Sequence, residues 1–117
     1  MRVLVTGGSG LLGRTTIAAL AARGHEVVAL QRHESSELTC RQVIADVCDR
    51  KAVAAAATGC DAVVHGAARV GVVGSREEFR RDNVGGTEAV VAACREAGAP
   101  RLVVVSSPSV GYESVPT

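Results

Sequence analysis

Five short apolar runs rich in β-branched residues recur along the chain, separated by longer alanine-rich stretches. Runs that are apolar throughout are typical of strands buried on both faces of a parallel sheet. We therefore expect five strands, at residues 2–6, 26–31, 42–45, 61–65 and 101–105.

Three helices are expected between these strands, at residues 11–23, 49–58 and 76–97. Gly24 ends the first helix, and Asp49 can cap the start of the second. The third carries apolar side chains at helical spacing and ends before Gly98 and Pro100. The short polar segment 32–41 is expected to be a loop. Alternating strands and helices predict right-handed βαβ units and a parallel α/β sheet.

Composition limits the size and the function of the protein. The 117 residues fit one domain, and 47% apolar with 21% charged residues are typical of a globular chain. A net charge of +1 without a basic stripe argues against a nucleic-acid partner. No apolar run is long enough for a signal peptide or a membrane span, so we expect a cytoplasmic protein without a membrane partner. The excess of arginine over lysine, with many alanines, indicates a GC-rich bacterial gene.

The four cysteines match neither a zinc-ligand spacing nor a CxxC pair. They are Cys40, Cys48, Cys60 and Cys94. We expect reduced thiols and no metal site, in agreement with a cytoplasmic location.

The sequence TGGSGLLG joins the first expected strand to the first expected helix. Gly7 permits a tight turn, Gly10 lets the backbone approach a pyrophosphate, and Gly13 lets the helix pack closely on the strand. The helix start, at Leu11 and Leu12, offers N–H groups and the positive end of the helix dipole to phosphates. A glycine triplet in this strand-loop-helix context predicts a dinucleotide site.

Two alternatives concern the same residues. The first is an ordinary glycine-rich turn. The second is a nucleoside-triphosphate P-loop, whose spacing is present but with Arg14 in place of the lysine that reaches the terminal phosphates. No expected strand ends in an aspartate that could hold magnesium, so the dinucleotide interpretation is preferred.

The end of the second expected strand indicates which dinucleotide binds. An acidic residue there would hydrogen-bond the ribose 2′-OH of NAD. This chain instead has Gln31 and Arg32, and nothing acidic before Glu34. Arg32 is placed to meet a 2′-phosphate with a charge-assisted, bidentate contact. We therefore expect NADP, with NAD possible; the alternative is that Arg32 is a solvated loop cation.

Residues after the third and fourth expected strands complete the predicted cofactor site. Asp46, followed by Val47, can accept a hydrogen bond from an adenine amino group; the alternative is a capping or loop aspartate. Ala67 and Ala68 are small enough for the backbone to lie against the cofactor. His65, just before them, is expected to be structural rather than catalytic.

Taken together, the motifs resemble those of the extended short-chain dehydrogenase/reductases of the NAD-dependent epimerase/dehydratase superfamily. The matching segments are TGGSGLLG at 6–13, Asp46-Val47, DAVVHGAA at 61–68, NVGGT at 83–87 and VVVSSPSV at 103–110. ALQR, AARVGVVG and SSPSV are similar to the branch of 3β-hydroxysteroid dehydrogenases and 2-alkyl-3-oxoalkanoate reductases. The resemblance implies a Rossmann-type doubly wound sheet of order 3-2-1-4-5, truncated after the fifth strand. It also implies hydride transfer between a nicotinamide and a secondary alcohol or ketone.

The resemblance also assigns candidate catalytic residues. It puts Ser107, next to Ser106, in the role of the serine that holds the substrate oxygen, with a turn hydroxyl as the alternative. Asn83 matches the asparagine of the family's NVxGT helix, whose role is either a proton relay or structural. The family's YxxxK motif is missing, because Pro116 rather than lysine lies four residues after Tyr112.

The sequence thus resembles the N-terminal half of a reductase, with a cofactor-binding domain at 1–117 and a small-molecule ketone or alcohol as substrate. Two other functions stay open: a non-catalytic dinucleotide-binding regulator, and a sugar-nucleotide epimerase or dehydratase, which usually has an acidic residue where this chain has Gln31 and Arg32. We also expect a homo-oligomer. Residues 102–105 would form an unpaired apolar edge, and helix 76–97 resembles the family's dimer-forming helices.

Overall fold

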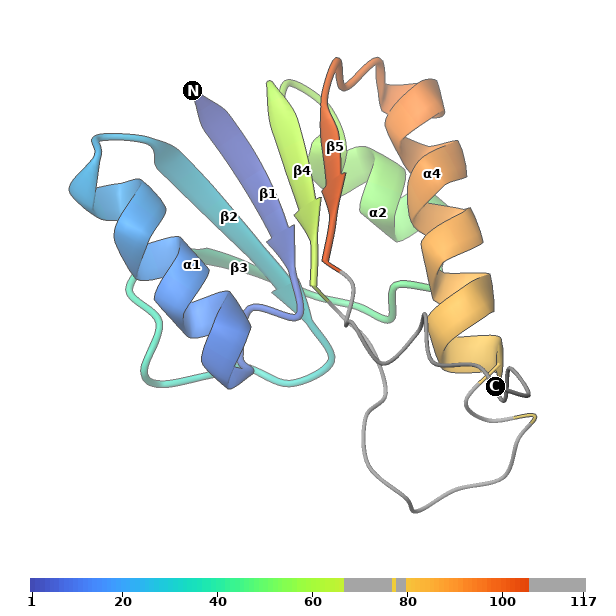
Figure 1. The fold of residues 1–117 in the computed structure, drawn as a ribbon, viewed down its shortest axis with the longest axis horizontal. Coiled ribbons are helices and arrows are strands. Elements are labelled where there is room, and N and C mark those ends of the chain that lie inside the picture. Colours follow the sequence, from blue (N-terminus) through green and yellow to red (C-terminus); the bar gives the residue numbers. More distant parts are fainter. Residues whose placement is uncertain (67–76, 78–79, 106–117) are drawn as a thin grey trace, which may run out of the picture.

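A five-stranded parallel sheet forms the centre of the fold in the computed structural model, which describes residues 1–66, 77 and 80–105 (Figure 1). The strands are β1 (Arg2–Thr6), β2 (Glu26–Gln31), β3 (Arg41–Ile44), β4 (Ala62–His65) and β5 (Leu102–Val104). Their order is β3-β2-β1-β4-β5, and each neighbouring pair is parallel. The Rossmann-type sheet and the strand order expected from the sequence are confirmed.

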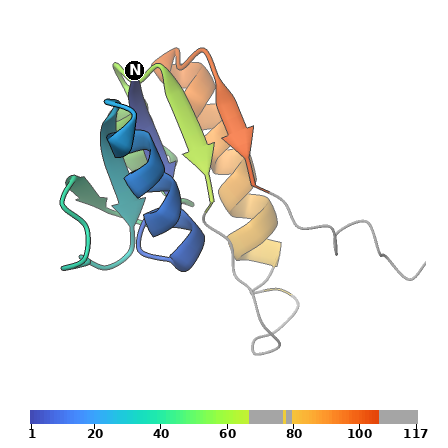
Figure 2. The same ribbon diagram turned by 60° about the vertical axis from the view of Figure 1, so that its left-hand side comes forward.

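Helices cover both faces of the sheet. Helix α1 (Leu11–Ala22) lies on one face, and α2 (Arg50–Ala57) and α4 (Gly86–Ala97) lie on the other (Figures 1 and 2). Each of the three ends where the sequence places a stop, and Gly24 and Gly98 both have positive φ. Asp49 caps α2 by accepting a hydrogen bond from the backbone N–H of Ala52 at 3.2 Å. None of the described helices is both long enough and apolar enough to cross a membrane.

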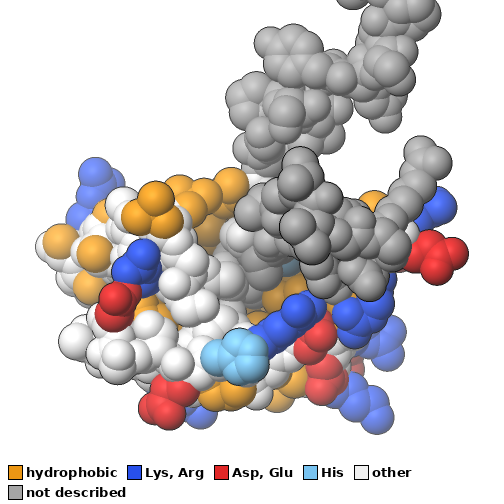
Figure 3. Space-filling model, turned by 90° about the horizontal axis from the view of Figure 1, so that it is seen from below, with side chains coloured by type: hydrophobic (Ala, Val, Ile, Leu, Met, Phe, Trp, Pro, Cys, Tyr) orange, Lys and Arg blue, Asp and Glu red, His pale blue; other side chains and the backbone are white. Residues whose placement is uncertain are grey.

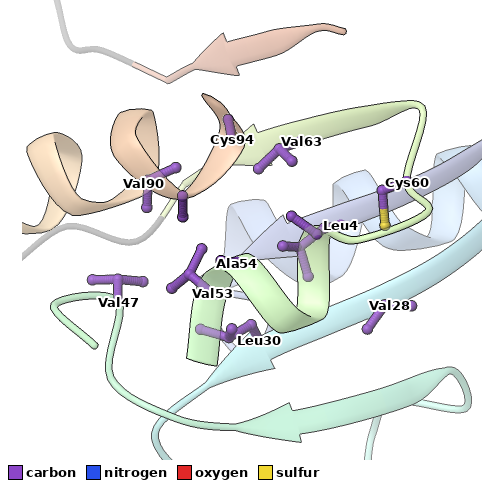
Figure 4. Close-up of a cluster of buried hydrophobic side chains, with 12 residues drawn as sticks. Leu4, Val28, Leu30, Val47, Val53, Ala54, Cys60, Val63, Val90 and Cys94 are labelled. Atoms are coloured by element: carbon purple, nitrogen blue, oxygen red, sulfur yellow. The ribbon is translucent and has the colours of Figure 1, made fainter. Parts of the chain in front are cut away.

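The core consists of two apolar clusters, one on each face of the sheet. On the α1 face, Val3 and Val5 of β1 pack with Ile17. On the opposite face, Leu4 of β1 packs with residues of α2 and α4, including Val53 and others labelled in Figure 4. Alternate residues of one strand therefore enter different clusters, which explains why these strands are apolar throughout.

The segment before α4 differs from the expected single helix over 76–97. A π-helical turn spans Arg80–Gly85, and regular α-helix begins only at Gly86. Gly86 also packs tightly against Val47, since a Cβ at this position would lie 3.0 Å from Val47 Cγ2. Two successive glycines weaken the α-helix, and this long-range contact constrains the backbone at the same point. The expected start near residue 76 falls among residues that are only partly described.

All five strands point the same way, so their carboxyl ends meet at one edge of the sheet (Figure 1). The strand order reverses at β1, which lies between β2 and β4. In open α/β sheets, ligands bind outside the carboxyl ends of the strands at such a reversal. The fold therefore directs attention to the loops that follow β1, β2, β3 and β4.

Candidate functional site

The glycine loop after β1 makes a tight turn back onto α1. Gly7 has a φ of +72°, and its N–H donates to the carbonyl of Leu30 at 2.8 Å. A Cβ on Gly13 would overlap the carbonyl oxygen of Gly7 and the Cα of Gly8. The close packing expected at Gly13 is thus made against the preceding loop. Both glycines are required by the protein's own geometry.

Gly10 differs from these two glycines because the protein's packing does not require it. Its φ and ψ of −76° and 169° are open to any residue, and a Cβ there would meet only Gly7 O, at an ordinary 3.6 Å. As the N-cap of α1, it offers no side chain to the first N–H groups, and no acidic residue occupies the first turn. The exposed side chains of Leu11 and Leu12 follow it. A helix start that has no side-chain cap, and no Cβ at the preceding residue, fits an anionic pyrophosphate.

A buried amide occupies the end of β2. Gln42 accepts from the N–H of Ser35 through Oε1 and donates to the carbonyl of Ser35 through Nε2, both at 2.9 Å. The Oε1 of Gln42 therefore faces Gln31, whose Nε2 donates to it at 2.6 Å. This arrangement turns Gln31 Oε1 toward the glycine loop, where it is buried and has no hydrogen-bond partner among the described residues. The end of β2 is therefore polar but uncharged.

Two arginines converge on Asp46 at the end of β3. Arg32 Nη2 lies 3.5 Å and Arg81 Nη2 lies 3.4 Å from the same oxygen, Asp46 Oδ2. The backbone N–H of Cys48 donates to Oδ1 at 2.9 Å. This hydrogen bond, together with the charges of the two arginines, lowers the pKa of Asp46 and keeps it ionised. Figure 3 shows charged side chains of both signs gathered on this edge.

Val47 and Arg14 have different environments from those of Arg32 and Asp46. Val47 is buried in the core, so its side chain faces the protein and only its backbone is left for a ligand. Arg14, at the position of a P-loop lysine, forms an ion pair with Glu37 instead. This pairing favours the dinucleotide interpretation over the P-loop interpretation.

A chain of hydrogen bonds runs from β1 through β4 to α4 beside the glycine loop. His65 Nδ1 lies 2.7 Å from Thr6 Oγ1, and His65 Nε2 lies 3.2 Å from Thr87 Oγ1. Thr87 in turn donates to the backbone carbonyl of Asn83 at 2.7 Å. Burial lowers the pKa of His65, so the ring is neutral near pH 7.

The remaining predicted residues are placed as follows. Asn83 lies in the π-helical turn, where its carbonyl is held by Thr87. Ala67, Ala68 and Ser107 lie outside the described residues. All four cysteines are described and are thiols, and burial raises the pKa of the Cys60 and Cys94 thiols. Within residues 1–66, 77 and 80–105, no group of three or more His, Cys, Asp or Glu side chains could hold a metal ion.

Sequence reasoning missed three participants at this edge: Arg81, Thr6 and Thr87. Arg81 reaches Asp46 across 35 positions, and Thr6 reaches His65 across 59. Thr87 lies in the NVGGT motif, so the motif itself was the available signal, although its partner His65 lies 22 positions away.

Comparisons with known proteins agree with this fold. The profile of the family described as "NAD dependent epimerase/dehydratase family" matches residues 3–116. The chain is 43% identical over 117 residues to a 2-alkyl-3-oxoalkanoate reductase of Stenotrophomonas maltophilia, covering 97% of this chain and 36% of the relative. It is 39% identical over 121 residues to a 3-beta-hydroxysteroid dehydrogenase of Mycolicibacterium neoaurum, covering 93% of this chain and 32% of that relative.

A solved structure with the same fold is a UDP-glucose 4-epimerase from Stenotrophomonas maltophila with bound NAD and formylated UDP-arabinopyranose. It superposes with a TM-score of 0.87 at 32% identity, covering 94% of this chain and 38% of the epimerase. The chain thus spans about a third of the length of the curated relatives it matches.

Proposed function

Because the chain belongs to the NAD-dependent epimerase/dehydratase family, we propose that residues 1–117 are the dinucleotide-binding domain of an NADP(H)-dependent oxidoreductase. The observation that carries the proposal is the glycine loop. The start of α1 has no side-chain cap, and neither the backbone angles nor the packing of the protein requires a glycine at position 10. In this proposal the pyrophosphate is bound by Gly7, Gly10, Leu11, Leu12 and Gly13.

The preference for NADP rests on the end of β2. Gln31 is neutral where a carboxylate would repel a 2′-phosphate, and its amide is locked by Gln42. Arg32 lies 3.5 Å from Asp46, so its guanidinium is already held at the edge where the adenosine ribose would lie. Asp46 and the backbone at Val47 would contact the adenine, and Ala67 and Ala68 the rest of the cofactor. The nicotinamide would supply or accept a hydride.

Arg32→Ala should lower the ratio of NADP affinity to NAD affinity. A charge-assisted hydrogen bond is worth about 1.5–3 kcal/mol, so the expected change is roughly 10- to 150-fold. The measurement is the dissociation constant of each dinucleotide by calorimetry. Loss of the ion pair with Asp46 would weaken both dinucleotides alike, and the ratio therefore isolates the 2′-phosphate contact.

A matched control for this variant is Arg50→Ala. Arg50 is also a half-exposed arginine in an ion pair, with Glu96 on the outside of α2 and α4. The Arg50→Ala variant should leave the affinities for NADP and NAD, and therefore their ratio, unchanged. An unaltered ratio in Arg32→Ala would show that Arg32 is a solvated loop cation and would remove the support for NADP.

For the whole reaction we propose the reduction of a small-molecule ketone or the oxidation of a secondary alcohol, with Ser107 and Asn83 near the reacting groups. The relatives named as a reductase and a dehydrogenase support this class. A sugar-nucleotide epimerase is the second candidate, supported by the superposed epimerase structure. Neutral Gln31 at the end of β2 favours the first. A cytoplasmic location stays a prediction.

The isolated chain should self-associate. Among the described strands, β5 is paired with β4 on one side only, and Val103 and Val105 are 55% and 39% exposed. The outer face of α4 carries a groove lined in part by Glu88, Val91 and Arg95. A second α4 related by a two-fold axis beside Val91 would place Glu88 opposite Arg95, which is a self-complementary arrangement.

Light scattering at high micromolar concentration measures this association. The wild-type chain should be larger than a monomer, and Val103→Lys should shift it toward monomer because a charge blocks an exposed edge. A wild-type chain that stays monomeric and binds no dye specific for exposed apolar surface would refute the prediction.

A further inference from the structure

Three elements each contribute one polar side chain to a hydrogen-bonded contact at the carboxyl edge of the sheet. Thr6 is the last residue of β1, His65 the last residue of β4, and Thr87 lies in the first turn of α4. Thr6 and His65 are almost fully buried, with 0% and 2% of their surface exposed. Thr87 is partly buried. Buried polar groups are hydrogen-bonded as a rule, so the bonds that the structure shows between these side chains allow their protons to be assigned.

The assignment starts at Thr87. A carbonyl oxygen only accepts, so the hydroxyl hydrogen of Thr87 lies in its 2.7 Å bond to the carbonyl of Asn83. Thr87 Oγ1 can then only accept from the ring, so His65 Nε2 carries the hydrogen across 3.2 Å. A neutral imidazole has one N–H, which leaves His65 Nδ1 to accept from Thr6 Oγ1 at 2.7 Å.

The same direction continues into the backbone after β4. The N–H of Gly66 donates to Thr6 Oγ1 at 3.1 Å. Every bond in the series therefore runs one way, from Gly66 through Thr6, His65 and Thr87 to the carbonyl of Asn83. One tautomer of His65 satisfies all of them, and the other tautomer would leave no hydrogen between His65 Nε2 and Thr87 Oγ1.

This series joins the two structures that flank the proposed cofactor site. Thr6 immediately precedes Gly7, the first glycine of the loop. At the other end, Thr87 holds the carbonyl of Asn83 inside the π-helical turn, where the i-to-i+4 backbone ladder is interrupted. The ring of His65 makes a hydrogen bond to each of the two threonines.

We infer that His65 is a positioning residue that fixes the glycine loop against the start of α4 and thereby sets dinucleotide affinity. The inference rests on the proposed function, because it assigns His65 a role in binding the same cofactor. In this role His65 would act on the proposed cofactor site through the two threonines that it hydrogen-bonds, Thr6 and Thr87. In the described part of the chain, its neighbours Thr6 on β1, Val104 on β5 and Thr87 on α4 do not titrate, and burial lowers the pKa of His65, so the ring stays neutral around pH 7.

Thr87→Val tests the inference, because valine keeps the shape of threonine but cannot accept from His65. We expect calorimetry to show weaker binding of NADPH, with a dissociation constant roughly 5- to 20-fold higher than that of the wild type. Thr87→Ser restores the hydroxyl and should bind within about twofold of wild type. Nitrogen-15 spectra of the wild-type ring should show hydrogen on Nε2 and none on Nδ1.

Thr58→Val is the matched control. The Thr58 hydroxyl makes the same bond to the carbonyl four residues earlier, Ala54 O, at 2.8 Å, with no histidine attached. Both valine variants should lower the unfolding temperature, but only Thr87→Val should lower affinity. Equal affinity in Thr87→Val and wild type, or hydrogen on Nδ1, would overturn this inference and leave the proposed function standing. A wild-type chain that binds neither NADPH nor NADH would overturn both.

Discussion

Gly10→Val should abolish dinucleotide binding while the chain stays folded. The backbone of Gly10 is extended, and a Cβ there meets only Gly7 O at 3.6 Å, so valine fits the protein. The same side chain would stand over the helix start where the pyrophosphate is proposed to lie. Losing several charge-assisted hydrogen bonds at once should weaken binding by more than about 100-fold.

Calorimetric titration with NADPH, together with circular dichroism of the unliganded variant, measures both parts of this result. Gly13→Ala provides the contrast, since its Cβ would overlap the carbonyl of Gly7 and should destabilise the fold itself. Gly10 and Gly13 belong to one motif, but the two variants would then lose binding for different reasons. If Gly10→Val binds NADPH as tightly as wild type, the loop does not hold the pyrophosphate.

The strands were predictable because their signal is local. A run such as RVLVT is apolar at every position, and the structure shows why: Leu4 enters one cluster, while Val3 and Val5 enter the other. The third strand was placed one residue late, at 42–45 rather than Arg41–Ile44. It lies at the edge of the sheet and is only partly buried, so its pattern marks its ends weakly.

The π-helical turn was not predictable from the sequence. Arg80–Gly85 contains nothing that forbids an α-helix before its final glycine. The helix changes where Gly86 meets Val47, a contact between residues far apart in the chain. Periodicity describes neighbours within an element, and it carries no information about such a contact.

The candidate site divides in the same way. The tight turn at Gly7 follows from a short motif, and the structure gives this glycine a positive φ. The locked amide of Gln31 and the pair of arginines on Asp46 depend on side chains from separate loops, and no local pattern indicates them. Sequence identifies the residue types at this edge, whereas only the fold shows which of them share an oxygen or a proton. The cofactor roles of Arg32, Asp46 and the alanines stay predictions.

The 117-residue chain should bind NADPH yet fail to oxidise it at a useful rate with ketone substrates. The glycine loop, Arg32 and Asp46 are present and lie at one edge of the sheet. The resemblance implies a proton donor from a YxxxK motif, and these residues hold one tyrosine, Tyr112, with proline rather than lysine four positions later. We therefore expect the chain to bind NADPH without supplying the proton that ketone reduction needs.

General acid–base catalysis typically contributes about 10²–10⁴-fold, and correct positioning of the substrate contributes more. Ser107 could hydrogen-bond a carbonyl oxygen, but the pKa of a serine hydroxyl is far too high for it to replace a tyrosine activated by lysine. Following NADPH absorbance with a panel of β-ketoacids and 3-ketosteroids, after calorimetry has shown binding, should reveal no turnover above the uncatalysed rate. Steady oxidation that disappears in Ser107→Ala would contradict this, because it would mean that the chain already holds a complete proton-transfer site built around that serine.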